Sequence, residues 1–440
     1  MAEALLLDLH KILAFGLLLA VMIIVHELGH FWAALAVGIR VETFSIGFGP
    51  RLFGFRRGDT DFRVSLIPLG GYVRMQGDQP GDEQAVDPAS FQAKARWQRA
   101  IVILAGPLMN IILAIVLLTG LYMYKFPKID NNGPAVITEI DPNSAAAQAG
   151  LQIGDRVVQF GDQVNPTWDY LGKQEMLNGN HAMDIAVLRN GQRLSLAVTP
   201  RIDTKEGVGV IGWGYGNIEV TGLEKGEPAQ VAGIRVGDIF LSIDGHAVVY
   251  RTSVRDWVAR SNGKPIEIQV RRDGKPLHFL VAPIKVNDGH YRIGVVYTES
   301  FPFPVEIVKL PFTDALAQSL RENRESAVLV FETLRGIMQR RVSPASMQGP
   351  IGIAKTSADA FERGPWYYLN LMSLVSLNLA IFNLLPIPIL DGGTLLLLLI
   401  EMLLQREVSL RVKETALKLG FVLLMMVVVF VFYNDLTRPA

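Results

Sequence analysis

The chain has 440 residues and no net charge, and 50% of its residues are hydrophobic while 19% are charged. It is too long for one ordinary domain, and without an overall basic field nothing argues for nucleic-acid binding. Because it contains no cysteine, disulfides and thiolate metal sites are excluded. Any metal ion must therefore be held by His, Asp or Glu.

Four apolar segments approach or exceed the roughly 20 residues that a helix needs to cross a bilayer core. They predict a multi-pass α-helical membrane protein whose spans cover residues 1–38, 99–125, 365–404 and 415–434. A cleaved signal peptide over residues 1–25 is disfavoured, because no small-residue cleavage site follows the apolar run. Lys and Arg are frequent in the segments after the first and third spans, which we assign to the cytoplasm. Both termini and the long segment between the second and third spans are then extracytoplasmic.

The segment 39–98 contains an alternating run, TDFRVSLIPLGGYVRM, at residues 60–75. Alternation of apolar and polar residues is typical of a strand, so we expect a β-hairpin or small sheet close to the first span. An edge strand there would clamp an extended peptide substrate. Val64 and Leu66 are the candidate contacts.

The extracytoplasmic segment contains an internal repeat. Residues 144–163 match residues 227–246 with an offset of 83 residues, and the shared pattern A-G-(L/I)-x-x-G-D resembles that of bacterial PDZ domains. We therefore predict two β-rich PDZ-like domains, a first module at 127–218 and a second module at 219–303. PDZ domains bind extended peptides by strand addition. The alternative is that one or both modules bind nothing and only block access.

Residues 304–364 follow the repeat. Within them Ala327, Val328, Phe331 and Leu334 recur at helical spacing between Arg and Glu residues. This pattern predicts amphipathic helices that lie on the membrane surface or pack against the spans.

Three ionisable residues interrupt the apolar run VMIIVHELGHFWAALAV of the first span. His26 and His30 are four residues apart and share one helix face, so both imidazoles can bind one zinc ion while Glu27 acts as general base. Such groups are costly in a membrane span unless they coordinate or pair. The alternatives are a pair of packed histidines or a structural metal site.

Catalytic zinc usually has three protein ligands and an open position, and the first span offers no third. The strongest candidate is Asp391, in the segment LNLAIFNLLPIPILDGGTLLLLL, where Pro386 and Pro388 prevent a regular helix. Irregular backbone at membrane depth is tolerated where it is buried in protein or lines a water-filled cavity. Glu401 is the weaker candidate, and an N-cap role for Asp391 is the alternative.

These motifs together resemble the site-2 protease family of intramembrane zinc metalloproteases. HELGH, N-x-x-P-x-P-x-L-D-G-G and the PDZ-like repeat carry the resemblance, and FSIGFGPRLF, PLGGYVRMQGD, AGPLMN and GPIGIA extend it over nearly the whole chain. One departure is Thr394, where relatives commonly have histidine. The resemblance implies that His26, His30 and Asp391 bind Zn²⁺ and that Glu27 is the catalytic base.

The resemblance also implies that Asn378 and Asn383 lie near substrate, although hydrogen bonding between helices is an equal alternative. It places the protein in a bacterial inner membrane, with periplasmic PDZ modules and the active site toward the cytoplasm. The implied substrates are single-pass membrane proteins already trimmed outside, an anti-sigma factor in envelope-stress signalling among them, and remnant signal peptides. The PDZ pair would act as a size filter.

Two other classes of protein could contain such features. One is a non-proteolytic membrane PDZ scaffold with a structural metal site. The other is a zinc transporter, which would need His and Asp across several spans. Four of the seven histidines, at 181, 246, 278 and 290, fall in the PDZ-like modules, which disfavours the transporter.

Overall fold

The computed structural model describes residues 2–78, 87–129, 134–204, 206–214, 217–248, 251–272, 275–286, 290–300 and 305–437. The chain divides into two compact units. The helical unit comprises Met1–Phe126, Ile307–Leu334 and Met347–Ala440, and the β unit comprises Pro127–Glu306 and Arg335–Ser346.

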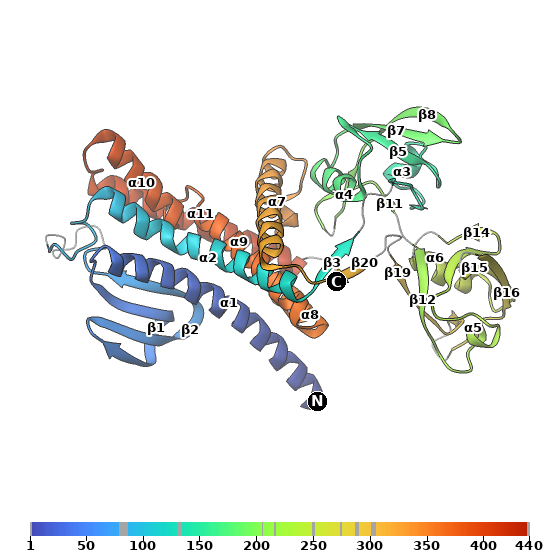
Figure 1. Cartoon of the computed structure of the whole chain (residues 1–440), viewed down its shortest axis with the longest axis horizontal. Helices are drawn as coiled ribbons and strands as arrows, with labels where there is room; N and C mark the ends of the chain where they lie inside the picture. Colours follow the sequence, from blue (N-terminus) through green and yellow to red (C-terminus); the bar gives the residue numbers. More distant parts are fainter. Residues whose placement is uncertain are drawn as a thin grey trace. The chain divides into compact units, whose positions relative to one another are not determined.

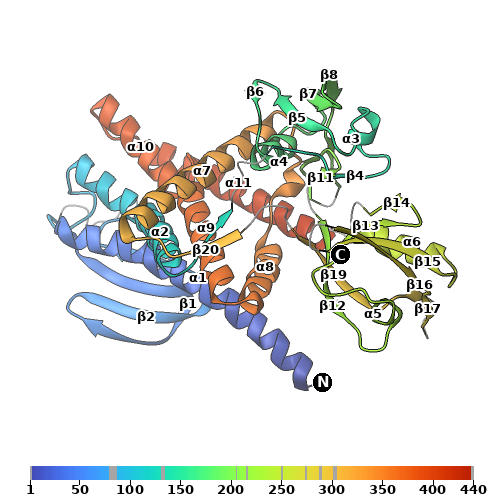
Figure 2. The ribbon, with the colours of Figure 1, turned by 45° about the vertical axis from the view of Figure 1, so that its right-hand side comes forward.

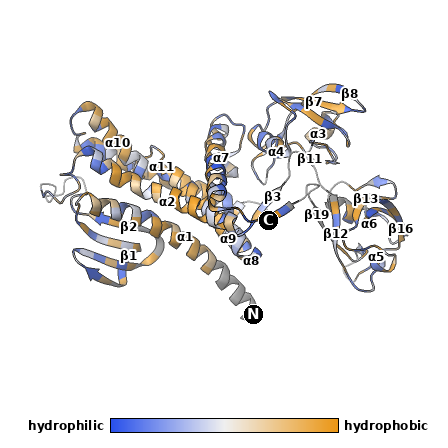
Figure 3. Ribbon diagram, in the orientation of Figure 1, coloured by the Kyte–Doolittle hydropathy of each residue, from blue (hydrophilic) through white to orange (hydrophobic). Residues whose placement is uncertain are grey.

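The helical unit is organised around α2, which contacts α1, α9 and α10 (Figure 1). Apolar residues are concentrated along these helices (Figure 3). The helices are α1 (Ala2–Ala36), α2 (Arg96–Tyr124), α7 (Phe312–Met338), α8 (Pro350–Arg363), α9 (Pro365–Asn383), α10 (Asp391–Leu404) and α11 (Leu410–Thr437).

Three of the helices in the described part of the chain are long and apolar enough to cross a membrane: Leu13–Ala36, Arg96–Tyr124 and Leu410–Thr437. The expected third span is not one helix, because α9 ends at Asn383 and α10 begins at Asp391. The two prolines between them explain the break. Ile389 within it has φ 122°, a conformation that is rare for a β-branched residue. The count of four spans stays a prediction.

Hydrogen bonds from the start of α8 hold the C-terminal end of the last helix, α11. Asp435 of α11 accepts hydrogen bonds from the backbone N–H groups of Gly349 (3.0 Å) and Gly352 (2.9 Å), at the start of α8. The exposed N–H groups of a helix start favour a carboxylate. The GPIGIA motif therefore serves to join α8 to α11.

Two long strands, β1 (Val41–Arg57) and β2 (Thr60–Met75), form an antiparallel sheet beside α1 (Figures 1 and 2). The expected hairpin is thus present, but both strands bend. Residues 41–46 pair with residues 71–75 on one side and with residues 61–64 on the other. The edges of the sheet are therefore residues 71–75 and 51–57.

The β unit contains both modules of the repeat. The first has a four-stranded sheet in the order β6-β5-β7-β8, and the second has a sheet in the order β16-β15-β13-β12-β19, with β14 paired to β13.

The first module contains β4 (Glu139–Ile140), α3 (Ala145–Gln148), β5 (Arg156–Phe160), β6 (Gln163–Val164), α4 (Trp168–Leu177), β7 (Met183–Arg189), β8 (Gln192–Val198), β9 (Arg201–Ile202), β10 (Gly209–Val210) and β11 (Trp213–Gly214). The second contains β12 (Asn217–Leu223), α5 (Pro228–Val231), β13 (Ile239–Ile243), β14 (His246–Ala247), α6 (Arg251–Arg260), β15 (Ile266–Arg272), β16 (Lys275–Val281), β17 (Ile284–Lys285), β18 (Tyr291–Arg292) and β19 (Val295–Ser300). β3 (Phe126–Ile129) pairs with β20 (Val305–Val308).

The aspartates of the repeat have the same role in both modules. Asp155 receives two hydrogen bonds from Arg189, each 2.7 Å, and Asp238 receives two from Arg272, each 2.6 Å. Bidentate pairs of this kind are strong and directional. The signature G-D therefore marks a buried ion pair that both modules keep.

A second acid of the first module, Glu175 in α4, makes stability depend on pH. Burial raises the pKa of its carboxyl from 4.5 to about 7, although hydrogen bonds from Trp213 and from the backbone of Ile211 oppose the change. A carboxyl whose pKa is higher in the folded state stabilises the fold below pH 4.5, and that contribution is lost as pH rises through 7. We expect the free energy of unfolding of the β unit to fall by about 2 to 3 kcal/mol between pH 5 and pH 8.

Urea unfolding of the full chain in detergent, followed by tryptophan fluorescence, measures this change. Glu175→Gln should remove most of the slope. A slope unchanged in that variant would assign the pH dependence to another group.

Candidate metal centre

The structure brings together three residues that are far apart in the sequence. His26 and His30 lie one turn apart on α1, and Asp391 is the first residue of α10. Their ligand atoms all lie within 4.8 Å of one another. Both histidines are buried, with 7% and 9% of their surfaces exposed.

The distances among these atoms fit a tetrahedral metal ion. His26 Nε2 lies 3.2 Å from His30 Nε2 and 3.2 Å from Asp391 Oδ2, and His30 Nε2 lies 3.6 Å from Asp391 Oδ1. Ligands at about 2.0–2.1 Å from a tetrahedral zinc ion lie roughly 3.3 Å from one another. Two imidazoles and one carboxylate are a donor set that zinc accepts, so the residues fit this metal.

The other nitrogens of the two imidazoles are also engaged. His30 Nδ1 lies 2.8 Å from the carbonyl oxygen of Val102, and His26 Nδ1 lies 3.3 Å from Nδ2 of Asn110 on α2. A histidine that binds metal through Nε2 carries its proton on Nδ1 and needs an acceptor there. Because Oδ1 of Asn110 has no partner among the described residues, the opposite orientation of the amide would let this oxygen accept the proton of His26 Nδ1.

Asn110 was missed as a site residue by sequence reasoning, which placed it only within the AGPLMN motif. It is fully buried. A lone amide in the middle of an apolar helix was the available signal, since such groups rarely lie in membrane spans without a partner.

Two glycines allow α1 and α2 to meet at this site. A Cβ on Gly29 would overlap the backbone carbonyl of Ala105, and a Cβ on Gly106 would overlap the imidazole of His30. The small residues of the AGP segment therefore let α2 approach the histidines closely.

The two asparagines of α9, Asn378 and Asn383, differ in their surroundings. Asn383 Nδ2 is 3.5 Å from His26 Nε2, a contact at the limit of hydrogen bonding. Asn378 Oδ1 is buried and has no partner within the described part of the chain. An unpaired buried acceptor is costly, so a group that donates to Asn378 would be favoured there.

The sheet edge 71–75 lies beside Glu27. The backbone N–H of Val73 donates a hydrogen bond to the Glu27 carboxylate, and a Cβ on Gly71 would lie 3.1 Å from Glu27 Cγ. Val64 is not at an edge, because it pairs with Ile46 on one side and Phe53 on the other. Val64 therefore does not lie at an edge that could pair with a substrate, which alternation alone could not reveal, and its contact with substrate stays a prediction.

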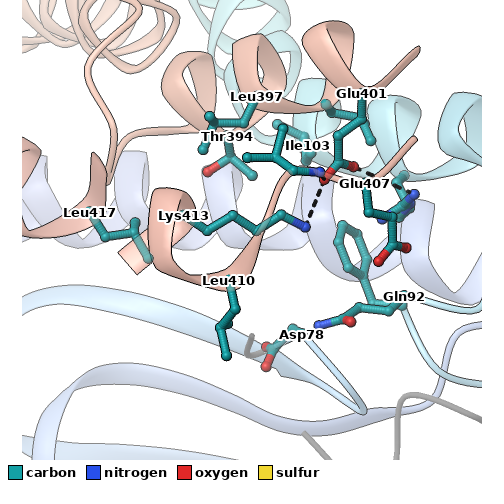
Figure 4. Close-up of a pocket in the computed structure, with 14 residues that line it drawn as sticks. Asp78, Gln92, Ile103, Thr394, Leu397, Glu401, Glu407, Leu410, Lys413 and Leu417 are labelled. Atoms are coloured by element: carbon teal, nitrogen blue, oxygen red, sulfur yellow. Dashed lines mark hydrogen bonds and ion pairs between the residues drawn. The ribbon is translucent and has the colours of Figure 1, made fainter. Parts of the chain in front are cut away.

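Glu401 does not join the three candidate ligands. It lies on α10 in a pocket of about 380 Å³, where its carboxylate is 2.7 Å from Lys413 Nζ and 4.0 Å from Arg99 Nη2. Figure 4 shows Lys413 of α11 directed toward Glu401. The Glu401 carboxylate balances the positive charges of Lys413 and Arg99, and its side chain is almost fully buried.

Replacing Glu401 by glutamine should destabilise the helical unit without changing the metal content of the folded protein. Removing one partner of a buried charge cluster costs about 3 kcal/mol. Thermal unfolding in detergent and zinc analysis of the folded fraction measure the two effects. Glu407→Gln is the matched control, because Glu407 lines the same pocket but is exposed. Loss of zinc in Glu401→Gln would contradict this assignment.

Comparison with known proteins identifies the family. Residues 14–427 match the model of a protein family described as peptidase family M50. The chain belongs to peptidase family M50. The resemblance to site-2 proteases is thereby confirmed, and the chain is a membrane-type peptidase.

Relatives of this M50 peptidase match over almost their full lengths. The "Regulator of sigma-E protease RseP" of Salmonella typhimurium is 32% identical over 457 residues, covering 98% of this chain and 99% of the relative. The protein of the same name from Escherichia coli is 32% identical over 450 residues, covering 97% and 98%. The PDZ domain of an SdrC-like protein from Listeria monocytogenes is 20% identical, covers 19% of this chain and 90% of that structure, and has a TM-score of 0.18.

Proposed function

We propose that this peptidase is a zinc-dependent endopeptidase that cleaves peptide bonds within the transmembrane segments of single-pass membrane proteins. The proposal rests on one observation: the ligand atoms of His26, His30 and Asp391 lie within 4.8 Å of one another, on helices of a membrane protein. Metal ligands at membrane depth are expensive unless they serve a site. Membership of peptidase family M50 supports peptide hydrolysis as the reaction at this site.

The roles of the residues follow from their atoms. His26 and His30 would hold the metal through Nε2, and Asp391 through its carboxylate. Bound there, zinc would lower the pKa of a water molecule to about 7 and polarise the scissile carbonyl. Glu27 takes a proton from the attacking water at its carboxylate and returns it to the leaving amine. The N–H of Val73 orients that carboxylate.

The substrate must be unwound, because a helix hides its peptide bonds in hydrogen bonds. The sheet edge 71–75 beside Glu27 is suited to pair with an extended segment. Asn378 and Asn383 are proposed to hold the substrate backbone or the oxyanion. Leu66, with 55% of its surface exposed, is proposed to contact apolar substrate side chains.

The biological setting is proposed from the loops and the relatives. We propose that the PDZ-like modules lie in the periplasm of a bacterial inner membrane and the centre toward the cytoplasm, an orientation that the Lys- and Arg-rich loops support. Relatives named regulators of sigma-E protease support a role in sigma-E signalling, and we propose an anti-sigma factor as the substrate and remnant signal peptides as a further class. The modules would then exclude substrates that still carry an ectodomain.

The test is cleavage of a single-pass protein by the purified chain in liposomes. We expect cleavage of a trimmed substrate, loss of cleavage after a chelator removes the metal, and recovery with zinc. An untrimmed version in the same assay should resist cleavage and become cleavable when residues 127–300 are deleted. Absence of cleavage with full zinc occupancy would favour a membrane PDZ scaffold with a structural metal.

A further inference from the structure

Glu175 accepts hydrogen bonds from a loop of its own module. It is the eighth residue of α4, and its Oε2 accepts a 2.7 Å hydrogen bond from the indole N–H of Trp213. The backbone N–H of Ile211 donates to the same carboxylate. Both donors belong to the segment Val-Ile-Gly-Trp at 210–213, which leads from β10 into β11.

This segment directs two donors at one carboxylate, the backbone N–H of Ile211 and the indole N–H of Trp213, and a loop of this kind can hold a carboxylate. PDZ domains add a peptide as an extra strand, and free peptide C-termini are captured by successive backbone N–H groups. Above its pKa of about 7 the Glu175 side chain presents the same carboxylate group as a peptide terminus. The helix also lies very close to the loop, because a Cβ on Gly209 would overlap the backbone carbonyl of Glu175. The donor positions are thus already occupied from within the module.

The second module provides an internal comparison. The N–H of Ala146 donates to Ile211 O at 2.8 Å, and the N–H of Ala229 donates to Ile293 O at 2.9 Å, so Ile293-Gly294 corresponds to Ile211-Gly212. The repeat offset of 83 residues places Val258 of α6 where α4 has Glu175. Val258 is apolar and buried, with 3% of its surface exposed. The second module therefore has an apolar residue where the first has Glu175, and the acid that packs against its loop is Glu227, at the start of α5, which a Cβ on Gly294 would overlap.

We propose that Glu175 occupies the carboxylate-binding loop of the first PDZ-like module as an intramolecular ligand and closes it to peptides that end in a free carboxylate. The ligand class that the opened loop would take is an extended peptide with an apolar last residue, since Ile211 of the loop belongs to the same buried apolar cluster as Leu171 of α4. This inference concerns peptide binding outside the membrane and does not depend on the proteolytic activity.

The experiment replaces Glu175 by valine, the residue of the second module, in the full chain in detergent. The probe is a pool of hexapeptides with three randomised C-terminal residues and free carboxyl groups, quantified by mass spectrometry after capture. We expect Glu175→Val to retain at least about tenfold more peptide than wild type, with no gain for the same pool in amidated form. Any binding by the second module is common to both proteins and cancels in the comparison.

Glu175→Gln is the matched control, because its amide oxygen still accepts from Ile211 and Trp213 and should keep retention near the wild-type level. Hydrogen exchange supplies an independent readout: the Ile211 amide should exchange about tenfold faster in Glu175→Val. Protection of the β5 and β7 amides verifies that the module is folded, and Glu175→Ala serves if the valine variant is not. A folded Glu175→Val or Glu175→Ala protein with wild-type peptide retention and wild-type exchange at Ile211 would overturn the proposal.

Discussion

Glu27→Gln is expected to abolish peptide cleavage in the membrane while leaving the metal in place. The carboxylate is adjacent to His26 but is not among the three candidate ligands, so its charge is needed for proton transfer and not for coordination. Loss of a general base typically costs about 10²- to 10⁴-fold in rate. Cleavage of a trimmed substrate in liposomes, together with zinc analysis of the same sample, measures both quantities.

Asp391→Ala is the comparison that separates the base from a ligand. It removes an oxygen donor that lies 3.2 Å from His26 Nε2, so zinc and activity should be lost together. If Glu27→Gln cleaved at the wild-type rate, the site would be structural and the proposed proteolysis would be wrong. If it lost zinc as completely as Asp391→Ala, Glu27 would be a ligand and not the base.

Sequence reasoning could assemble the centre because two local signals were strong. Helical spacing puts His26 and His30 on one face, and the prolines before Asp391 predict broken backbone at membrane depth. The structure then shows the three side chains together. Sequence spacing does not predict which residues of other elements contact the site. Asn110 lies on α2 and Val73 on a sheet edge, and no sequence motif links either residue to the histidines or to Glu27.

The β1–β2 sheet shows why the substrate contacts were harder to predict. Alternation identifies a strand but not its neighbours. Gly47 and Gly49 have φ of 88° and Gly70 has φ of 123°, conformations that favour glycine and let both strands bend. The second half of β2 thereby returns along β1 and becomes the edge beside Glu27. Val64, which the pattern made a candidate, is placed inside the sheet.

Gly106→Ala should lower zinc affinity although it changes no ligand. The added Cβ would overlap three atoms of the His30 imidazole, Nε2 among them. The ring cannot turn away freely, because its Nδ1 is held by Val102 O at 2.8 Å, and densely packed interiors relax only partially. Displacement of a metal-binding imidazole of this kind costs about 10- to 100-fold in affinity.

Competition with a chelator of known zinc affinity measures the effect, and proteolysis should fall in parallel at limiting zinc. Gly120→Ala is the matched control in the same helix, because a Cβ there has no other atom within 4 Å. Wild-type zinc affinity in Gly106→Ala would show that His30 is not held against α2 and that the centre does not depend on this close approach. Equal losses in both variants would indicate a general effect on α2, since only Gly106 faces the imidazole.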